Sequence, residues 1–376
     1  MPVANSWFWN ERFWLPINVT WADLRNSDEA RYPQAEDLYS AFPYAILIFL
    51  IRIVFERFVA TPVALCIGVK AGRVNKAESN TILEKVFKTV TQYPSKKHVQ
   101  GLAKQLDWST RQVERWFRHR RNQERPTLLT KFCESSWRFT FYTAAFIYGF
   151  QHMKELKWFW DTKYCWIDYP YQSLTDQLEK YYLLELSFYC SLLFSQFLDV
   201  KRKDFVQMFI HHIATVMLIG FSWVVNMIRV GALIILTHDV SDIFLEAAKM
   251  TNYAKYQRIC DVLFIIFAII FFVSRLIVFP LYVFKSAAIE SREICGPWPS
   301  WWIFNILLLV LQLLHIFWFS IIMRMVYKSL THGKVDRDAR SDCEESSTDE
   351  YNEDEDAKGT FINNGKIGQM NSTYKH

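Results

Sequence analysis

Glycine and proline are scarce in this chain of 376 residues, with 11 of each. This scarcity argues against a loop-rich or disordered protein. The seven cysteines include no Cys-x-x-Cys pair, so neither a zinc module nor a dense disulfide framework is indicated. The first residues show no apolar run followed by a small-residue cleavage site, and we expect no cleavable signal peptide.

Apolar and aromatic residues are abundant, at 51% and 17%. The mean hydropathy is nevertheless near zero, because apolar blocks alternate with very polar segments. Seven blocks approach the length of about 20 residues that a helix needs to cross a bilayer. They cover residues 41–62, 137–153, 181–198, 205–225, 227–247, 261–284 and 301–323, of which the second is the shortest. The pattern predicts an all-α, polytopic membrane helix bundle of about seven spans.

The basic residues of the short connections predict the orientation of these spans. Lysine and arginine gather in segments 201–203, 249–258 and 324–337, which fall on one side if seven spans are counted. We expect that side to be cytosolic and the N-terminus to be lumenal. Asn18, in Asn-Val-Thr, is then a candidate N-glycosylation acceptor. Three lysines in the lumenal segment after the second block weaken this charge signal.

The tail from residue 333 onward is acidic and has no apolar periodicity, so its composition predicts disorder. Ser341, Ser346 and Ser347 each have an acidic residue three positions on, which suits an acid-directed kinase. A regulatory tail and a merely solvated one fit these residues equally well.

The polar segment between the first two blocks predicts a small helical insert with helices near 79–90, 96–105 and 110–123. Its stretch 112–122 contains Trp-Phe followed by a basic run, and resembles the recognition helix of homeodomains. DNA binding through the major groove is one interpretation. However, His119 stands where homeodomains place an adenine-binding asparagine. We favour a helical module whose basic face lies near anionic lipid or a phosphate group. That face would comprise Arg118, Arg120, Arg121 and Arg125.

Ionisable residues within the fourth and fifth blocks predict a functional site, because such groups are costly inside a bilayer. His211 and His212 are adjacent in the sequence. Successive residues of a helix are rotated by about 100°, so the two rings cannot occupy the same position. Asp239 and Asp242 are three apart, so we expect both on one face, reaching toward the histidines. With Glu185 and Glu246, these residues should also lower the hydropathy of blocks three to five.

Three chemistries fit two histidines and two aspartates. A metal site is conceivable, although adjacent histidines suit metal ligation poorly. A proton relay in a transporter is the second alternative. The third is acyl transfer, in which a neutral imidazole acts as base or nucleophile and a carboxylate orients it. The residue types alone leave all three open and favour the third.

The motifs around these residues resemble the signature of the ceramide synthases. The resemblance includes segment 199–205 leading to the two histidines, segment 229–231 through 238–242, and segment 245–253. It extends to segments 7–16 and 340–342 and so covers nearly the whole chain. It implies five parts: a lumenal segment 1–40, a first span 41–62, a homeodomain-like insert 67–128, a TLC (TRAM/LAG1/CLN8) catalytic membrane domain 131–332 and the tail 333–376.

The resemblance implies transfer of an acyl group from a fatty acyl-CoA to sphinganine or sphingosine in the endoplasmic reticulum membrane. Acyl-CoA would be a co-substrate, with no tightly bound cofactor. His211 would be the base or the acyl-accepting nucleophile, assisted by His212, Asp239 and Asp242. The residues assigned to substrate binding are Lys201, Arg202, Lys203, Arg229 and Arg275. A homo- or heterodimer with related synthases stays open, as do a membrane-tethered homeodomain-type regulator and a sphingolipid transporter or sensor.

In this family the loop between the last two spans is associated with acyl-chain length. The loop here, about residues 290–300, resembles that of members preferring palmitoyl-type chains. The residues assigned to this role are Ser291, Arg292, Glu293, Ile294, Cys295, Gly296, Pro297 and Trp298. Arg292 and Cys295 depart from the pattern of those members. Cys165 and Cys295 are both expected to be lumenal, and a disulfide between them is left open.

Overall fold

The computed structural model describes residues 8–28, 30–69, 76–124, 126–200 and 202–332. Within these ranges every regular element is a helix and there is no strand, which confirms the all-α prediction. The predicted phosphorylation sites, the acidic tail and Lys201 lie outside the described residues.

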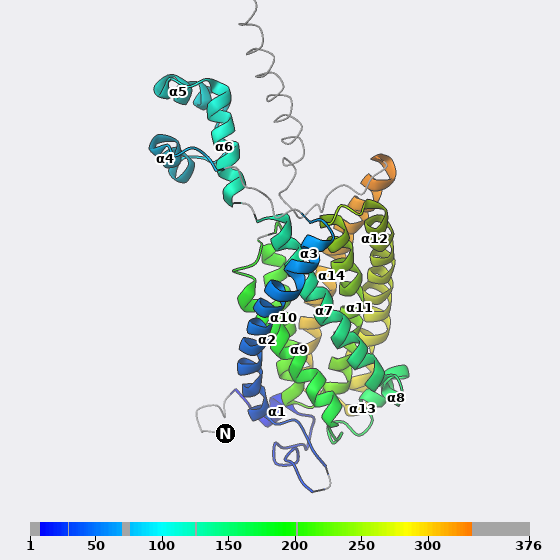
Figure 1. The fold of residues 1–376 in the computed structure, drawn as a ribbon. Coiled ribbons are helices and arrows are strands. Elements are labelled where there is room, and N and C mark those ends of the chain that lie inside the picture. Colours follow the sequence, from blue (N-terminus) through cyan, green and yellow to red (C-terminus); the bar gives the residue numbers. More distant parts are fainter. Residues whose placement is uncertain (1–7, 29, 70–75, 125, 201, 333–376) are drawn as a thin grey trace, which may run out of the picture.

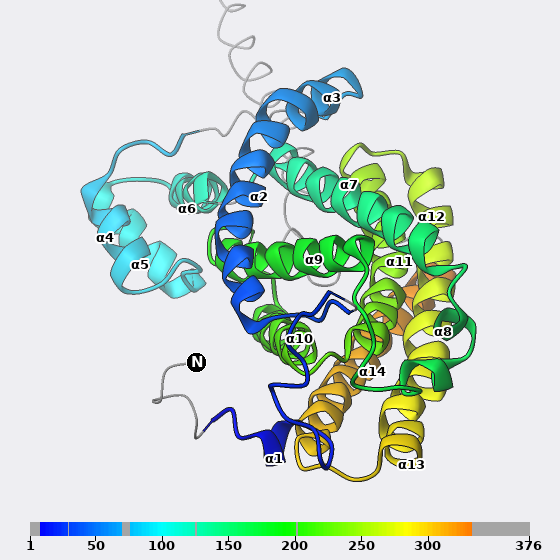
Figure 2. The ribbon, with the colours of Figure 1, turned by 90° about the horizontal axis from the view of Figure 1, so that it is seen from below.

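In the described part of the chain, seven long helical segments form a bundle (Figures 1 and 2). The first combines α2 (Ala41–Phe55), η3 (Glu56–Ala60) and α3 (Thr61–Cys66). The sixth combines α12 (Gln257–Phe271), η5 (Phe272–Phe284), η6 (Ser286–Glu290) and α13 (Ser291–Cys295). The others are α7 (Leu128–Met153), α9 (Asp176–Ser195), α10 (Phe205–Val224), α11 (Ile228–Tyr253) and α14 (Trp301–His332).

Several helices extend beyond the predicted apolar blocks, and two of them bear on the predicted site. Helix α7 begins at Leu128 rather than near residue 137, and its first turns bury polar side chains such as Glu134 and Ser135. The sixth segment stays helical to Cys295, with Pro280 inside the π-helical η5. The predicted chain-length loop is therefore mainly helix, followed by a short connection to α14.

Four of the described segments are long and apolar enough to cross a membrane: Ala35–Cys66, Phe205–Val224, Gln257–Cys295 and Trp301–Tyr327. Helices α7, α9 and α11 have the length but not the apolarity, because charged residues interrupt them. Blocks three and five are absent from these four segments, in line with the effect expected from their ionisable residues. For block four, α10, this expectation is wrong, because the two histidines stand among large apolar residues.

Helix α11 is the central helix of the bundle, because it packs against α7, α9, α10, α12 and η5. Helix α14 closes the opposite side against α10, α12 and η5. Helix α2 lies outside this group and packs against α9 (Figure 2). Six helical segments therefore surround the interior, and the first segment is an outer addition.

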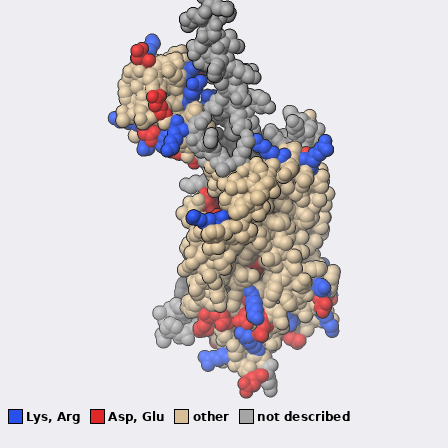
Figure 3. Space-filling model, viewed as in Figure 1, with Lys and Arg blue, Asp and Glu red and all other residues tan. Residues whose placement is uncertain are grey.

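The two ends of the bundle carry different attachments (Figure 1). Helices α3 and α6 lie at one end, which we name the insert end. The opposite end, which we name the far end, carries α1 (Glu11–Trp14), α8 (Lys157–Trp160) and α13. On the face in Figure 3, charged side chains gather at both ends and in the insert, with few between them. Apolar side chains such as Ile46, Ile265 and Leu313 are more than half exposed along the intervening surface, as lipid contact requires.

The insert consists of α4 (Thr81–Thr89), α5 (Lys96–Leu106) and α6 (Thr110–Glu124), as predicted. Its own small core contains Leu83, Phe87, Val99, Leu102, Val113, Trp116 and Phe117. Arg120, expected on a free basic face, is tied to Glu84 by two hydrogen bonds of 2.8 and 3.0 Å. Hydrogen bonds from Arg120 and Lys88 hold the pKa of Glu84 down at about 2. Much of the predicted basic face thus has a structural role inside the insert.

The N-terminal segment covers the far end of the bundle. Trp14 is fully buried and packs on Phe221 of α10, with ring centroids 5.0 Å apart. The Ser300 N–H donates to the Phe13 carbonyl at 2.8 Å, and the Ser300 hydroxyl donates to the Trp14 carbonyl at 3.0 Å. Asn18, the predicted glycosylation acceptor, is exposed in this segment.

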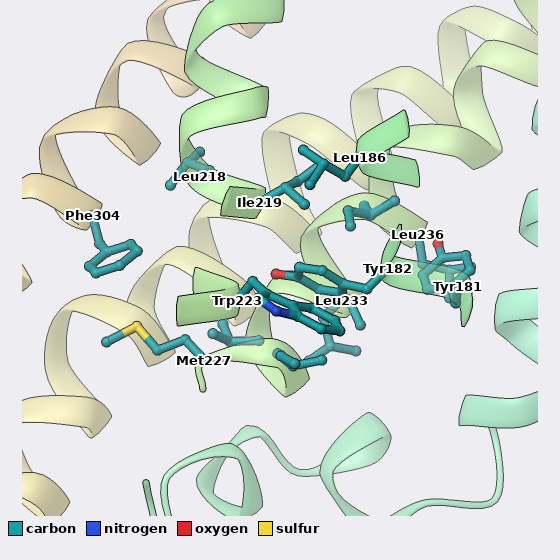
Figure 4. Close-up of a cluster of buried hydrophobic side chains, with 14 of the residues drawn as sticks. Tyr181, Tyr182, Leu186, Leu218, Ile219, Trp223, Met227, Leu233, Leu236 and Phe304 are labelled. Atoms are coloured by element: carbon teal, nitrogen blue, oxygen red, sulfur yellow. The ribbon is translucent and has the colours of Figure 1, made fainter. Parts of the chain in front are cut away.

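A dense cluster of large side chains fills the far half of the bundle (Figure 4). Tyr182 lies at its centre, and its hydroxyl is hydrogen-bonded to Ser222. Gly231 of α11 lies directly against this phenol, where an added methyl group would collide with the hydroxyl oxygen. Glycine is therefore required for the close approach of α9 and α11 at this point.

Candidate active site

A polar cavity lies within the bundle toward the insert end, in a space of about 1150 Å³. It is lined by side chains from α7, α9, α10, α11, α12, η5 and α14 and from the connection between α9 and α10. Its charged or titratable residues are Glu134, Arg138, Tyr142, Tyr189, Asp199, Arg202, Asp204, His211, His212, Asp242, Glu246, Lys249 and Arg275. So many ionisable groups inside a membrane bundle mark this cavity as the candidate site.

The two predicted histidines both line this cavity from α10. Their ring centroids are 5.7 Å apart. The Nδ1 atom of His212 is 2.9 Å from the Gln196 amide oxygen, so this ring is held by a neighbour. The Nδ1 atom of His211 is buried and has no hydrogen-bond partner in the described part of the chain. The ring of His211 is thus not held through Nδ1 as the ring of His212 is.

The two predicted aspartates are separated in the structure. Asp242 lines the polar cavity and accepts a 2.9 Å hydrogen bond from Arg275. Asp239 is fully buried and interacts with Glu185 of α9, away from the lining of the cavity. Helix α11 lies between α9 and η5, so residues three apart on it face different neighbours. The structure thus brings Asp242, and not Asp239, to the cavity of the histidines.

Arg275 holds several groups of the site together. Its guanidinium donates to the Ser241 hydroxyl at 3.0 Å, to the His238 carbonyl at 2.9 Å and to Asp242. It also lies over the ring of Phe271, 5.1 Å from the centroid. The side chain is 4% exposed, so its charge is balanced within the protein rather than by water.

The other predicted substrate-binding residues are scattered. Arg202 lines the polar cavity, whereas Lys203 is exposed beside it. Arg229 lies away from the cavity and donates to the Tyr164 carbonyl at 2.8 Å. Of the assigned cations that the structure describes, Arg202 and Arg275 are thus the two that line the cavity.

Sequence reasoning missed several charged residues of the cavity wall. Arg138 of α7 pairs with Glu134 at 2.9 Å and with Asp199 at 2.8 Å, and Lys249 of α11 pairs with Glu246 at 2.6 Å. Glu134 stands just before residue 137, where the predicted span began, and Lys249 just after residue 247, where another ended. Charge next to an apolar block was read as a boundary, although it is part of the site.

The first helical segment contributes to the same network from outside. Arg52 of α2 pairs with Asp199 at 2.6 Å and with Glu56, four residues further along the same helix face, at 2.7 Å. Asp199 is thereby shared between Arg52 and Arg138. The outer helix is joined to the wall of the cavity through this carboxylate.

A second, apolar chamber lies on the far side of the histidines, with about 690 Å³ of empty space that is partly open to the surroundings. Large side chains line it, among them Tyr182, Leu218, Ile219, Met227, Phe304 and Trp301. Of the residues assigned to chain length, Trp298 lines the chamber, whereas Arg292, Glu293, Ile294 and Pro297 are exposed. Trp298 is thus the member of that set in direct contact with the chamber.

The polar cavity and the apolar chamber adjoin at three side chains. Tyr189 of α9 lines both spaces, His211 lines the polar cavity and His238 of α11 lines the chamber. The rings of the two histidines lie 6.3 Å apart between centroids and within 24° of parallel. We name these three residues the neck.

Two further alternatives from the sequence can be compared with the geometry. In the described residues, no group of three or more His, Cys, Asp or Glu side chains is arranged to hold a metal ion. Cys165 and Cys295 are both free thiols. The Cys295 thiol instead donates to the Trp166 carbonyl at 3.6 Å.

Comparison with known proteins agrees with the family resemblance of the sequence motifs. The TLC domain model matches residues 131–324 and the Homeodomain model matches residues 73–126. Human ceramide synthase 5 is 54% identical over 92% of this chain and 88% of its own length. Mouse ceramide synthase 5 is 55% identical over 91% and 83%, and human ceramide synthase 4 is 45% identical over 92% and 88%. The chain therefore belongs to the ceramide synthases, multi-pass membrane acyltransferases of sphingolipid biosynthesis, as its motifs indicated.

Proposed function

We propose that this chain transfers a fatty acyl group, of palmitoyl type, from acyl-CoA to the amine of sphinganine or sphingosine. The products would be dihydroceramide or ceramide and free CoA. The names of its relatives support ceramide synthesis. The observation that carries the choice of site is the meeting of a polar cavity and an apolar chamber at His211.

Both substrates combine a polar head with a long apolar tail, and each part matches one space. Arg138, Arg202 and Lys249 line the polar cavity, where cations suit the phosphates of CoA. The chamber is walled by aromatic and aliphatic side chains, which suit an acyl chain. The thioester of a bound acyl-CoA would then lie near the neck, beside His211.

The proposed reaction proceeds at Nε2 of His211. In one route the nitrogen attacks the thioester carbonyl, the C–S bond breaks, and the CoA thiolate leaves an acyl-imidazole. The neutral sphingoid amine then attacks this carbonyl, the C–N bond to the ring breaks, and the amide and the free imidazole form while the amine proton passes to the released CoA thiolate. In the other route the imidazole accepts the amine proton while the amine attacks the thioester directly, and the thiolate receives that proton on leaving.

Asp242 and Arg275 would support either route from the cavity wall. Asp242 is the predicted carboxylate that the structure places in the same cavity as the reacting ring. We propose that it assists proton movement from the ammonium form of the sphingoid base. Arg275 holds this carboxylate through the 2.9 Å hydrogen bond. His212, held by Gln196, would keep its neighbour's ring in place.

We place the insert end on the cytosolic side of the endoplasmic reticulum membrane, where acyl-CoA is made. The basic connections and the exposed sequon at the opposite end support this orientation. Full glycosylation of Asn18, removed by Asn18→Gln, would agree with it. The tail contains a second sequon at Asn371, and glycosylation there with Asn18 unmodified would contradict this orientation.

Purified full-length protein with palmitoyl-CoA and sphinganine tests the proposal. Free CoA and dihydroceramide should appear in equal amounts, and His211→Ala and Asp242→Ala should each abolish both. His152→Ala, at an exposed histidine of α7, serves as the matched control and should retain the parental rate. Release of CoA without dihydroceramide, or full activity of His211→Ala, would refute the proposed site.

A single-turnover experiment separates the two routes. Parent protein is mixed with radiolabelled palmitoyl-CoA without amine and quenched in denaturant. Label retained on the peptide that contains His211, and absent from His211→Ala, supports the acyl-imidazole. Label that never joins the protein supports direct attack.

A further inference from the structure

His315 of α14 forms a buried contact that the proposed chemistry does not use. Its Nε2 atom lies 2.9 Å from Nε2 of His238, and its side chain is fully buried. Its ring stands between Phe279 and Phe271, at centroid distances of 5.1 and 6.4 Å. A buried histidine in so apolar a helix needs an explanation, because an imidazole inside a membrane is costly.

The hydrogen bonds assign the protons of this pair. The Nδ1 atom of His238 is 2.6 Å from the Ile234 carbonyl, which can only accept, so Nδ1 carries the hydrogen. In the neutral ring Nε2 of His238 is then an acceptor. The hydrogen between the two rings must belong to Nε2 of His315, because two lone pairs at 2.9 Å would repel each other. His315 is therefore the donor that fixes the ring of His238.

The position of His238 gives this hydrogen bond a consequence. His238 belongs to the neck, opposite His211, and lines the chamber. An acyl chain with its carbonyl at His211 and its tail in the chamber must pass beside the ring of His238. The orientation of that ring therefore bears on the space left for the chain between the polar cavity and the chamber.

We infer that His315 is a positioning residue for long acyl chains, which holds the ring of His238 aside at the neck. This inference rests on the proposed function and adds a role that depends on chain length. Without the donor, the buried Nε2 of His238 has no partner in this location. The ring then turns toward other polar groups and narrows the neck, because an unsatisfied buried acceptor is costly.

The test compares a long and a short acyl donor in the full-length protein. His315→Leu removes the donor with little change in size. Transfer from palmitoyl-CoA to sphinganine should fall by at least about tenfold in kcat/KM, whereas transfer from hexanoyl-CoA should change less than about twofold. A six-carbon chain ends before the chamber and does not need the passage. His315→Asn, whose amide can donate to His238, should recover most of the palmitoyl activity.

The outcomes separate this inference from the proposed function. A parent protein that transfers neither acyl group refutes the proposed function. An active parent in which His315→Leu lowers both donors equally, or lowers neither, refutes the role of His315 alone. So does a His315→Asn variant as impaired as His315→Leu. If His315→Leu does not fold, His315→Met takes its place, since an unbranched side chain adapts to the same space.

Discussion

The insert and the membrane bundle are both helical, but they distribute polar and apolar side chains in opposite ways. In the insert, Phe87 and Trp116 are buried and the Arg120–Glu84 pair lies at the rim of the core. In the bundle, apolar side chains face outward and the Arg275–Asp242 pair lies inside. The same two residue types thus occupy opposite positions in the two regions.

The difference shows where an ion pair carries information about function. At a water-exposed rim an arginine–carboxylate pair contributes little to stability and is easily replaced. Inside a bilayer-spanning bundle each charge is costly, and breaking a pair leaves the other charge stranded. Charged residues that persist there mark a site, whereas those of the insert describe the surface of a small soluble module.

The largest effect is expected from breaking the interior pair. Arg275→Met should lower transfer by at least about a hundredfold with both palmitoyl-CoA and hexanoyl-CoA, because Asp242 loses its buried partner. Arg258→Met, at an exposed arginine of the same helical run, should stay within about twofold of the parent. Steady-state rates of CoA release measure both. A parental rate of CoA release in Arg275→Met would show that the ion pair inside the bundle matters no more for function than the pair at the rim of the insert.

A change of specificity rather than rate is expected at the end of the chamber. Trp298→Ala should shift the preferred acyl donor toward longer chains, because it removes a large side chain that lines the chamber. Competition among acyl-CoA species of increasing length, read by mass spectrometry of the products, measures the shift. Trp302→Ala is the matched control, since Trp302 is 61% exposed. Equal profiles for both variants would show that Trp298 does not limit the chamber.

The smallest effect is expected in the insert. The lowered pKa of Glu84 means that its stabilising pair with Arg120 is complete above pH 4.5 and is lost as the pH falls toward about 2. Hydrogen exchange of the full-length protein, corrected for intrinsic rates, should show α4 and α6 losing protection over that range. Glu84→Gln should reduce protection at pH 7 and largely remove this pH dependence, while acyl transfer changes less than about twofold. Glu114→Gln, at an exposed residue of α6, is the control. Loss of transfer in Glu84→Gln would show that the insert takes part in the site.

The sequence predicted the seven helical segments, because blocks of apolar residues about 20 long have few other uses. It also singled out His211, His212 and Asp242, since ionisable residues stand out in such blocks. It could not separate Asp242 from Asp239. Spacing on one helix gives the angle between two side chains, but not which neighbouring helix each one meets.

His315 is an ionisable residue within an apolar block, and the sequence analysis did not single it out. It is the one histidine in the last apolar block, and the same rule that selected the other histidines applies to it. Its partner His238, 77 positions earlier, was expected to point elsewhere than Asp239 and Asp242. The pair became visible only when α11 and α14 were placed around a common interior.

Arg52 shows that a boundary drawn by sequence similarity need not be a boundary of the electrostatics. The match to the TLC domain begins at residue 131, but the guanidinium of Arg52 neutralises Asp199 inside that domain. A shortened protein starting at residue 131 would leave Asp199 with one cation fewer and Arg138 with a larger share of its charge. The first membrane helix of this chain is therefore part of the charge environment of the polar cavity, although it lies outside the matched domain.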